Sequence, residues 1–261
     1  MTVPPAERAM RRALGGFFWG ALMFAGAAAA QPWIGHELIY EGPTPVNLAG
    51  RPVVADIALH ADMNAAAKKI LRVALVTDVT KFVGQTEADL ENWIATRQAD
   101  CGERWKAGEP LIDFPQGAIR FALDLEIEYW TCGVDGKATP SRLARETGRI
   151  DVTLIPYVSD GNLRARLGDF SIENRTGISK YLPLEFIVRG ALDQEIAKLN
   201  KNTKFYRAPE PFHSLGYQYE SMKGEKKPDG RVVITARYRG AGEASAYSAL
   251  AARMRESGVS Q

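Results

Sequence analysis

Residues 118–132 have the sequence AIRFALDLEIEYWTC, and its alternation decides the fold class. The odd positions from 119 to 129 are all apolar or aromatic, whereas the even positions hold an arginine, an alanine and three carboxylates. A period of two residues predicts a β-strand with one apolar and one polar face. At about 3.4 Å per residue, the segment up to Thr131 would span roughly 45 Å, far longer than an ordinary strand. We therefore expect an α+β fold with a long, highly curved antiparallel sheet rolled around amphipathic helices.

Residues 1–30 predict an export signal. Arg8, Arg11 and Arg12 precede an apolar run over residues 17–30, which ends in a stretch of alanines that includes Ala28, Ala29 and Ala30. A basic start, a short apolar run and small residues at its end are typical of a cleaved secretory signal. The run is short for a membrane span, although an uncleaved anchor is the alternative. We expect cleavage after Ala30 and, because the alanine-rich signal is of bacterial type, a periplasmic mature chain.

The charge of the expected mature chain is balanced. The signal holds three of the 33 basic residues and one of the 31 acidic residues, which leaves 30 of each. A nucleic-acid-binding protein concentrates positive charge instead. The composition therefore excludes a nucleic-acid partner.

The two cysteines, Cys101 and Cys132, predict a structural disulfide. An even number of cysteines in an exported chain favours pairing over a free thiol. Two cysteines cannot complete a tetrahedral zinc site, and no histidine is near either of them in the sequence. Closing a loop of about thirty residues would stabilise the fold by roughly 3–4 kcal/mol in the entropic model. A metal or redox role is the alternative.

The remaining segments predict a single domain over residues 31–240, with a flexible or helical tail over residues 241–261. Two amphipathic helices are expected, over residues 86–101 and 183–201, with a loop over residues 133–147. A phase change at Gly168 predicts a β-bulge. The other expected strands alternate in the same way as residues 118–132, and they cover residues 36–41, 53–61, 71–79, 109–114, 149–159, 163–174, 217–223 and 231–239.

No group of residues predicts catalysis or metal binding. Asp124, Glu126 and Glu128 would lie on one strand face, where they could bind a cation or serve a hydrolase as acid and base. The pattern favours the simpler interpretation, a solvated outer face. The three histidines are scattered, and no nucleophile or phosphate-binding motif occurs. We therefore expect no enzyme, no cofactor and no metal.

The order of these segments resembles the tubular lipid-binding (TULIP) superfamily, in its bacterial periplasmic type. The resemblance covers roughly residues 73–239. It rests on a helix ending near Cys101, the long strand ending at Cys132, a strand pair, and the helix LPLEFIVRGALDQEIAKLNKN. It implies a sheet wrapped around helices that holds a lipid or another apolar molecule. The implied ligand contacts are apolar residues of the concave face and the inner helix stripe: Phe121, Leu123, Leu125, Ile127, Val152, Leu154, Val188 and Leu192.

Three functional hypotheses follow from the sequence. The first is a periplasmic binding or carrier protein for a lipid or other hydrophobic molecule, with membrane surfaces or envelope proteins as further partners. The alternative is a non-enzymatic cell-envelope scaffold or interaction module on the same fold, with a core filled by side chains. The third, a hydrolase using residues 124–128, has the least support.

Overall fold

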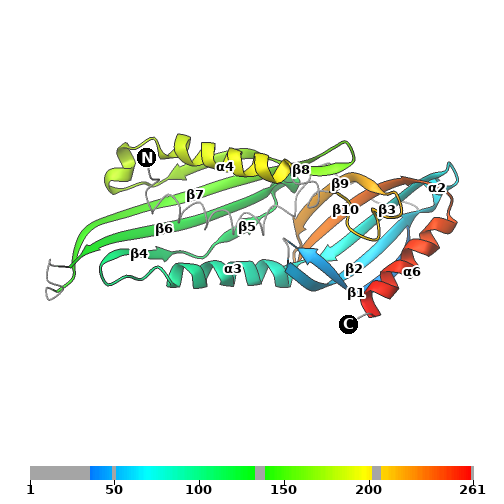
Figure 1. Ribbon diagram of the computed structural model, residues 1–261, viewed down its shortest axis with the longest axis horizontal. Helices are drawn as coiled ribbons and strands as arrows, with labels where there is room; N and C mark the ends of the chain where they lie inside the picture. Colours follow the sequence, from blue (N-terminus) through cyan, green and yellow to red (C-terminus); the bar gives the residue numbers. More distant parts are fainter. Residues whose placement is uncertain (1–35, 49–50, 133–138, 202–206, 260–261) are drawn as a thin grey trace.

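The chain folds into two antiparallel sheets with α-helices packed against them (Figure 1). The computed structural model describes residues 36–48, 51–132, 139–201 and 207–259, so the expected signal lies outside the described residues. Sheet A has the order β1-β2-β3-β10-β9, and sheet B has the order β4-β6-β7-β8 with β5 also paired to β6. The strands of sheet A are β1 (His36–Leu48), β2 (Arg51–Asp62), β3 (Ile70–Asp78), β9 (Gln218–Lys226) and β10 (Val232–Ala241). Those of sheet B are β4 (Gly102–Ala107), β5 (Leu111–Asp113), β6 (Ile119–Thr131), β7 (Ser141–Ser159) and β8 (Asn162–Glu173).

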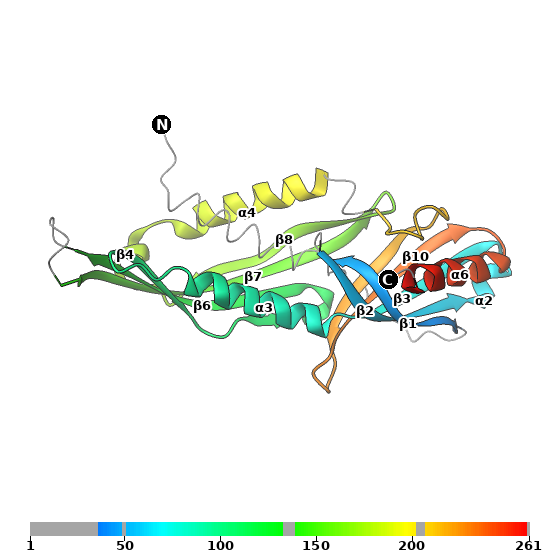
Figure 2. The same cartoon turned by 60° about the horizontal axis from the view of Figure 1, so that its bottom comes forward.

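The helices flank the sheets at their edges. In sheet B, α3 (Thr80–Ala95) lies on the β4 side and α4 (Leu184–Lys201) lies along β8 (Figures 1 and 2). The amide side chain of Asn200 accepts from the backbone N–H of Ala165 and donates to its carbonyl, so α4 also covers the free edge of β8. In sheet A, α6 (Ser245–Val259) packs on β1. The shorter elements are α2 (Met63–Ala66) and the 3-10 turns η1 (Pro115–Gly117) and η2 (Gly177–Tyr181).

The prediction of one rolled sheet is corrected to two sheets, which lie end to end along the long axis of the molecule (Figure 1). The α+β class, the antiparallel pairing and the predominance of strands are as expected. The division arises because β3 pairs with β10, some 160 residues later in the chain, rather than with the strands that follow it directly. Local alternation cannot show such a choice of partner.

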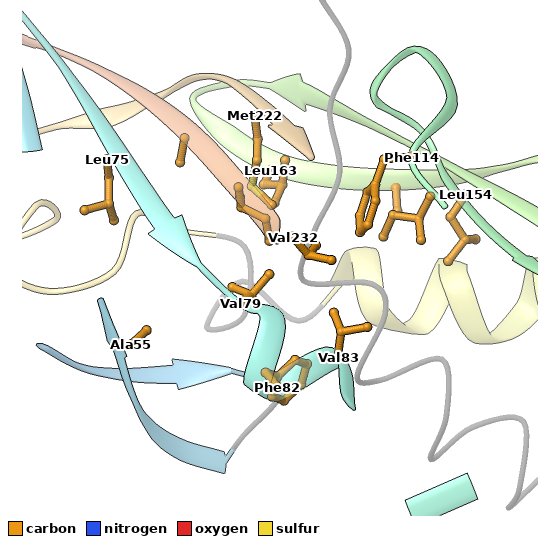
Figure 3. Packing of buried hydrophobic residues seen from close by; sticks show 14 of the residues in the cluster. Ala55, Leu75, Val79, Phe82, Val83, Phe114, Leu154, Leu163, Met222 and Val232 are labelled. Carbon is orange, nitrogen blue, oxygen red and sulfur yellow. The ribbon is translucent and has the colours of Figure 1, made fainter. Parts of the chain in front are cut away.

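Both sheets share one hydrophobic core (Figure 3). At the junction, the ring of Phe114, which directly follows β5, lies against Gly224 of β9. The N–H of Tyr219 donates to the carbonyl of Gly161 in the β7–β8 turn. The start of α3 is fixed to β10, because the N–H of Val232 donates to the hydroxyl of Thr80. The core is therefore continuous from one sheet to the other.

The helix expected over residues 86–101 is wrong at both ends. Asp78 accepts hydrogen bonds from the backbone N–H and the hydroxyl of Thr80, and α3 starts there. The expected N-cap Thr86 is inside the helix, where its hydroxyl donates to the carbonyl of Phe82. After Ala95 the chain turns into β4, which no local pattern predicted because charged residues surround its one large apolar residue, Trp105.

The loop expected over residues 133–147 is also corrected, since β7 already begins at Ser141. This part of β7 is hydrophilic, and it is a strand because it pairs with the far half of β6. Residues 133–138 lie outside the described residues.

Several local predictions are confirmed. The β-bulge at Gly168 is present as a register shift between β7 and β8, opposite residues 152–154. The expected helix over residues 183–201 is α4, and the final hairpin is β9–β10. The tail forms α6, in which the buried hydroxyl of Tyr247 accepts from the N–H of Arg72 and donates to the carbonyl of Asp62.

Candidate functional site

The predicted apolar wall divides into a filled part and a partly open part. Six of its eight residues are buried among other apolar side chains in the core: Phe121, Leu123, Val152, Leu154, Val188 and Leu192. The other two, Leu125 and Ile127, are half-buried, and Leu125 packs against that core. The apolar side chains on this face of β6 are therefore fully buried up to Leu123 and only partly buried at Leu125 and Ile127.

Five residues form what we call the distal apolar face: Trp93, Trp105, Ala107, Leu125 and Ile127. Directly paired residues share a face of a sheet, and Trp105 pairs with Ile127 while Ala107 pairs with Leu125. The ring of Trp93, on α3, meets that of Trp105 edge to face, with 5.7 Å between their centroids. All five side chains are half-buried, so α3, β4 and β6 together present a continuous apolar surface that is partly open.

Polar groups border the distal apolar face at the end of sheet B that points away from sheet A (Figure 1). The indole N–H of Trp105 donates to Glu103 at 3.0 Å. Burial raises the pKa of the Tyr129 hydroxyl, and the negative charges of Glu146 and Glu103 raise it further. A ligand on this face would meet apolar side chains along most of its length, and carboxylates with a protonated phenol at one end.

The opposite face of β6 carries a ladder of ion pairs. Asp124 pairs with Arg149 at 2.7 Å and Glu128 with Arg142 at 2.9 Å, while Glu126 pairs with Arg145. Hydrogen bonds from these arginines lower the pKa of Glu126 and of Glu128 below the ordinary value. A general acid requires the opposite shift. This face therefore joins the strands, and the lowered pKa values do not favour Glu126 or Glu128 as a general acid.

A cavity of about 400 Å³ lies across sheet B next to this ladder. Leu125 is the one residue of the predicted wall in its lining. The other lining residues are mainly polar or small: Lys106, Ala107, Gly108, Asp124, Glu126, Thr147, Gly148 and Asn174. Within the described part of the chain, no three histidine, cysteine or acidic side chains gather as metal ligands would.

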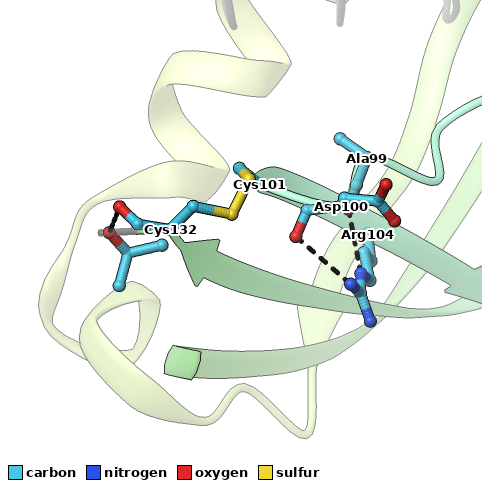
Figure 4. Close-up of a disulfide and its surroundings, with 6 residues drawn as sticks. Ala99, Asp100, Cys101, Arg104 and Cys132 are labelled. Atoms are coloured by element: carbon cyan, nitrogen blue, oxygen red, sulfur yellow. Dashed lines mark hydrogen bonds between the residues drawn. A yellow bond between two sulfur atoms is a disulfide. The ribbon is translucent and has the colours of Figure 1, made fainter. Parts of the chain in front are cut away.

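The predicted disulfide between Cys101 and Cys132 is present (Figure 4). Cys101 directly precedes β4 and Cys132 directly follows β6, and these strands pair from Gly102 and Trp130 onward. The bridge thus joins two neighbouring strand ends rather than a helix end and a strand. It fixes β4, and with it Trp105, against β6.

Comparison with known proteins gives a limited result. No protein-family model matches the chain, and no curated protein matches it. A solved structure of a lipopolysaccharide binding protein aligns with 64% of this chain at 11% identity and a TM-score of 0.33. The aligned part makes up 31% of that protein, so the chain spans less than a third of its length. A likeness at this level assigns the chain to no family. Among the described helices, none is long and apolar enough to cross a membrane.

The sequence prediction missed two features of the site. Trp93 and Trp105 were not expected there, because the strand that holds Trp105 was not recognised. The exposed apolar residues at the start of α4, Phe186 and Ile187, were also missed. The run Phe186-Ile187-Val188 was the available signal, because three consecutive residues span about 200° of a helix and cannot all face the core.

Proposed function

We propose that this protein binds a lipid or another elongated hydrophobic molecule on the distal apolar face, and carries it through the periplasm. The observation that supports the proposal is the loss of cover along β6. Ile119, Phe121 and Leu123 are at most 6% exposed, whereas Leu125 and Ile127, on the same face, are half-buried. Two tryptophans complete this face, so an apolar ligand would replace water over a continuous surface.

The energetics favour a ligand with an alkyl chain. Each buried CH₂ contributes about 0.8 kcal/mol, so a chain of about ten carbons gains roughly 8 kcal/mol before the costs of association. Sheet B, flanked by α3 and α4, would hold such a chain along β6. The expected export signal and the disulfide fit a role outside the cytoplasm. Transport by sequestration needs no catalytic residue.

Native mass spectrometry of the mature protein purified from a bacterial periplasm tests the proposal. We expect a bound mass that organic extraction identifies as a lipid, and uptake of a fluorescent fatty acid by the emptied protein. Ile127→Asp should weaken uptake about tenfold or more, because it places a charge on the apolar face. Val54→Asp is the matched control, since Val54 is an exposed apolar strand residue of sheet A. Empty protein that takes up no fatty acid would refute the proposal.

A scaffold or interaction module remains the second candidate, favoured by the filled part of the wall. Six predicted ligand contacts pack against protein instead. That function predicts an empty protein and a stable envelope partner recovered by cross-linking, with Ile127→Asp leaving the partner bound.

A further inference from the structure

A compact group of exposed apolar side chains lies where η2 leads into α4. Tyr181 and Phe186 are each 82% exposed, Ile187 is 55% exposed and Leu182 is 46% exposed. These four residues, the α4 patch, account for four of the nine large apolar side chains that are exposed in the described chain. Such a concentration marks an interaction surface rather than scattered surface residues.

The α4 patch is not part of the hydrophobic core. The buried stripe of α4 consists of Val188, Leu192, Ile196 and Leu199. Phe186 lies two residues before Val188, which is about 200° around the helix, so it points away from that stripe. Its side chain could reach the core only if α4 rotated and exposed the stripe instead.

The patch is held in a fixed arrangement. The guanidinium of Arg175 donates to the carbonyl of Leu182 at 3.0 Å, and it lies 3.9 Å from the carboxylate of Glu185. The N–H of Ile187 donates to the carbonyl of Pro183, which closes the first turn of α4. A partner therefore meets preformed apolar side chains and loses little conformational entropy in ordering them.

The charges beside the patch are positive. Lys180 precedes Tyr181 and Arg189 lies one residue beyond Val188, and both are exposed. Neither forms an ion pair with another residue of the described chain, whereas the acidic residue next to Phe186, Glu185, lies beside the guanidinium of Arg175. An isologous contact with a second copy would bring like charges together, which disfavours self-association through this surface. An anionic surface complements Lys180 and Arg189.

We propose that the α4 patch, with Lys180 and Arg189, docks on an anionic lipid surface. Aromatic and aliphatic side chains beside cations are the combination by which proteins attach to the interface of an anionic bilayer. The patch lies at the end of α4 that points away from sheet A (Figure 1), so docking would bring the far half of sheet B to the surface. This contact goes beyond the proposed function, because it requires no bound molecule on the distal apolar face.

Vesicle sedimentation with the full mature protein tests the docking. We expect binding to vesicles of phosphatidylglycerol and phosphatidylethanolamine, with weak binding to phosphatidylcholine. Phe186→Ser with Ile187→Ser should reduce binding about tenfold or more, because the variant lacks two apolar side chains that the bilayer would bury. Lys180→Gln with Arg189→Gln should reduce both the binding and its dependence on salt. The matched control, Leu38→Ser with Val54→Ser, removes two exposed apolar residues of sheet A and should bind like the wild type.

Three results would overturn the docking: wild-type protein that does not bind anionic vesicles, patch variants that bind them as well as the wild type, or a concentration-dependent dimer that Phe186→Ser abolishes. The last result would assign the patch to a second copy. Circular dichroism checks that the variants fold, which is expected because the substituted side chains lie outside the core. Native mass spectrometry of the same variants separates this proposal from the first, since loss of docking should leave any bound lipid in place.

Discussion

At the scale of single residues, the contact between Phe114 and Gly224 controls how the two sheets meet. A Cβ at Gly224 would lie 2.8 Å from Cε1 of the Phe114 ring and closer still to Cδ1. Phe114 is itself buried, so its ring has no free direction in which to move. Glycine is required here for the close approach of a ring to a strand, and not for an unusual backbone angle.

Gly224→Ala should therefore destabilise the protein by about 1–3 kcal/mol, because an added methyl group overpacks the junction. Urea unfolding measures this as a lower midpoint at an unchanged slope. Gly190→Ala is the matched control: it is inside α4, and a Cβ added there would have nothing within 4 Å. That substitution should raise the stability by about 0.5–1 kcal/mol. Equal effects of the two substitutions would contradict the role of the Phe114 contact.

At the scale of secondary-structure elements, the sequence predicts faces better than it predicts partners. Alternation identified β6 and its two faces, and the phase change at Gly168 located a bulge that the register confirms. The same reasoning could not find β4, whose pairing with β6 depends on a strand distant in sequence. It also could not say which odd residues of β6 are fully buried, because burial depends on which side chains of other elements pack on this strand. The change from a buried side chain at Leu123 to a half-buried one at Leu125 therefore results from tertiary packing and not from the local sequence pattern.

The ion-pair ladder between β6 and β7 should make the protein sensitive to acid. The pKa of Glu126 and of Glu128 is lower in the folded chain than the ordinary value of 4.5. Their stabilisation is therefore complete above about pH 5 and is lost as the pH falls through the lowered pKa values. We expect the urea midpoint to fall as the pH is lowered from about 5 to about 3.

Glu128→Gln should remove part of that fall, because the amide cannot titrate. Glu41→Gln serves as the control, since Glu41 forms no ion pair with any residue that the structure describes, and its variant should follow the wild-type curve. A Glu128→Gln variant with the full wild-type dependence on pH would show that other carboxylates are responsible.

At the scale of the whole molecule, the end-to-end arrangement raises the question of whether the sheets are separate folding units. Each sheet has its own helix partners, yet residues of both belong to one hydrophobic cluster. Figure 3 shows Leu154 of sheet B and Phe114, which directly follows β5, beside Met222 and Val232 of sheet A, with Val79 and Val83 at the start of α3. Burial that crosses the junction couples the sheets, because neither can unfold without exposing the apolar surface of the other.

We therefore predict a single cooperative unfolding transition. Trp93 lies on α3, and Trp105 and Trp130 lie in sheet B; with Trp33 replaced by Phe throughout, tryptophan fluorescence reports on sheet B, whereas hydrogen exchange of β10 reports on sheet A. The two measurements should give the same urea midpoint in the wild type.

Phe114→Ala should lower the stability by about 3–5 kcal/mol and separate the two midpoints, because it leaves a cavity at the junction of the two sheets. Ile172→Ala is the control inside sheet B: it removes a buried side chain of β8, so it should lower both midpoints together. Separate midpoints in the wild type would mean that the sheets are independent domains, and that the distal apolar face of sheet B could be studied without sheet A.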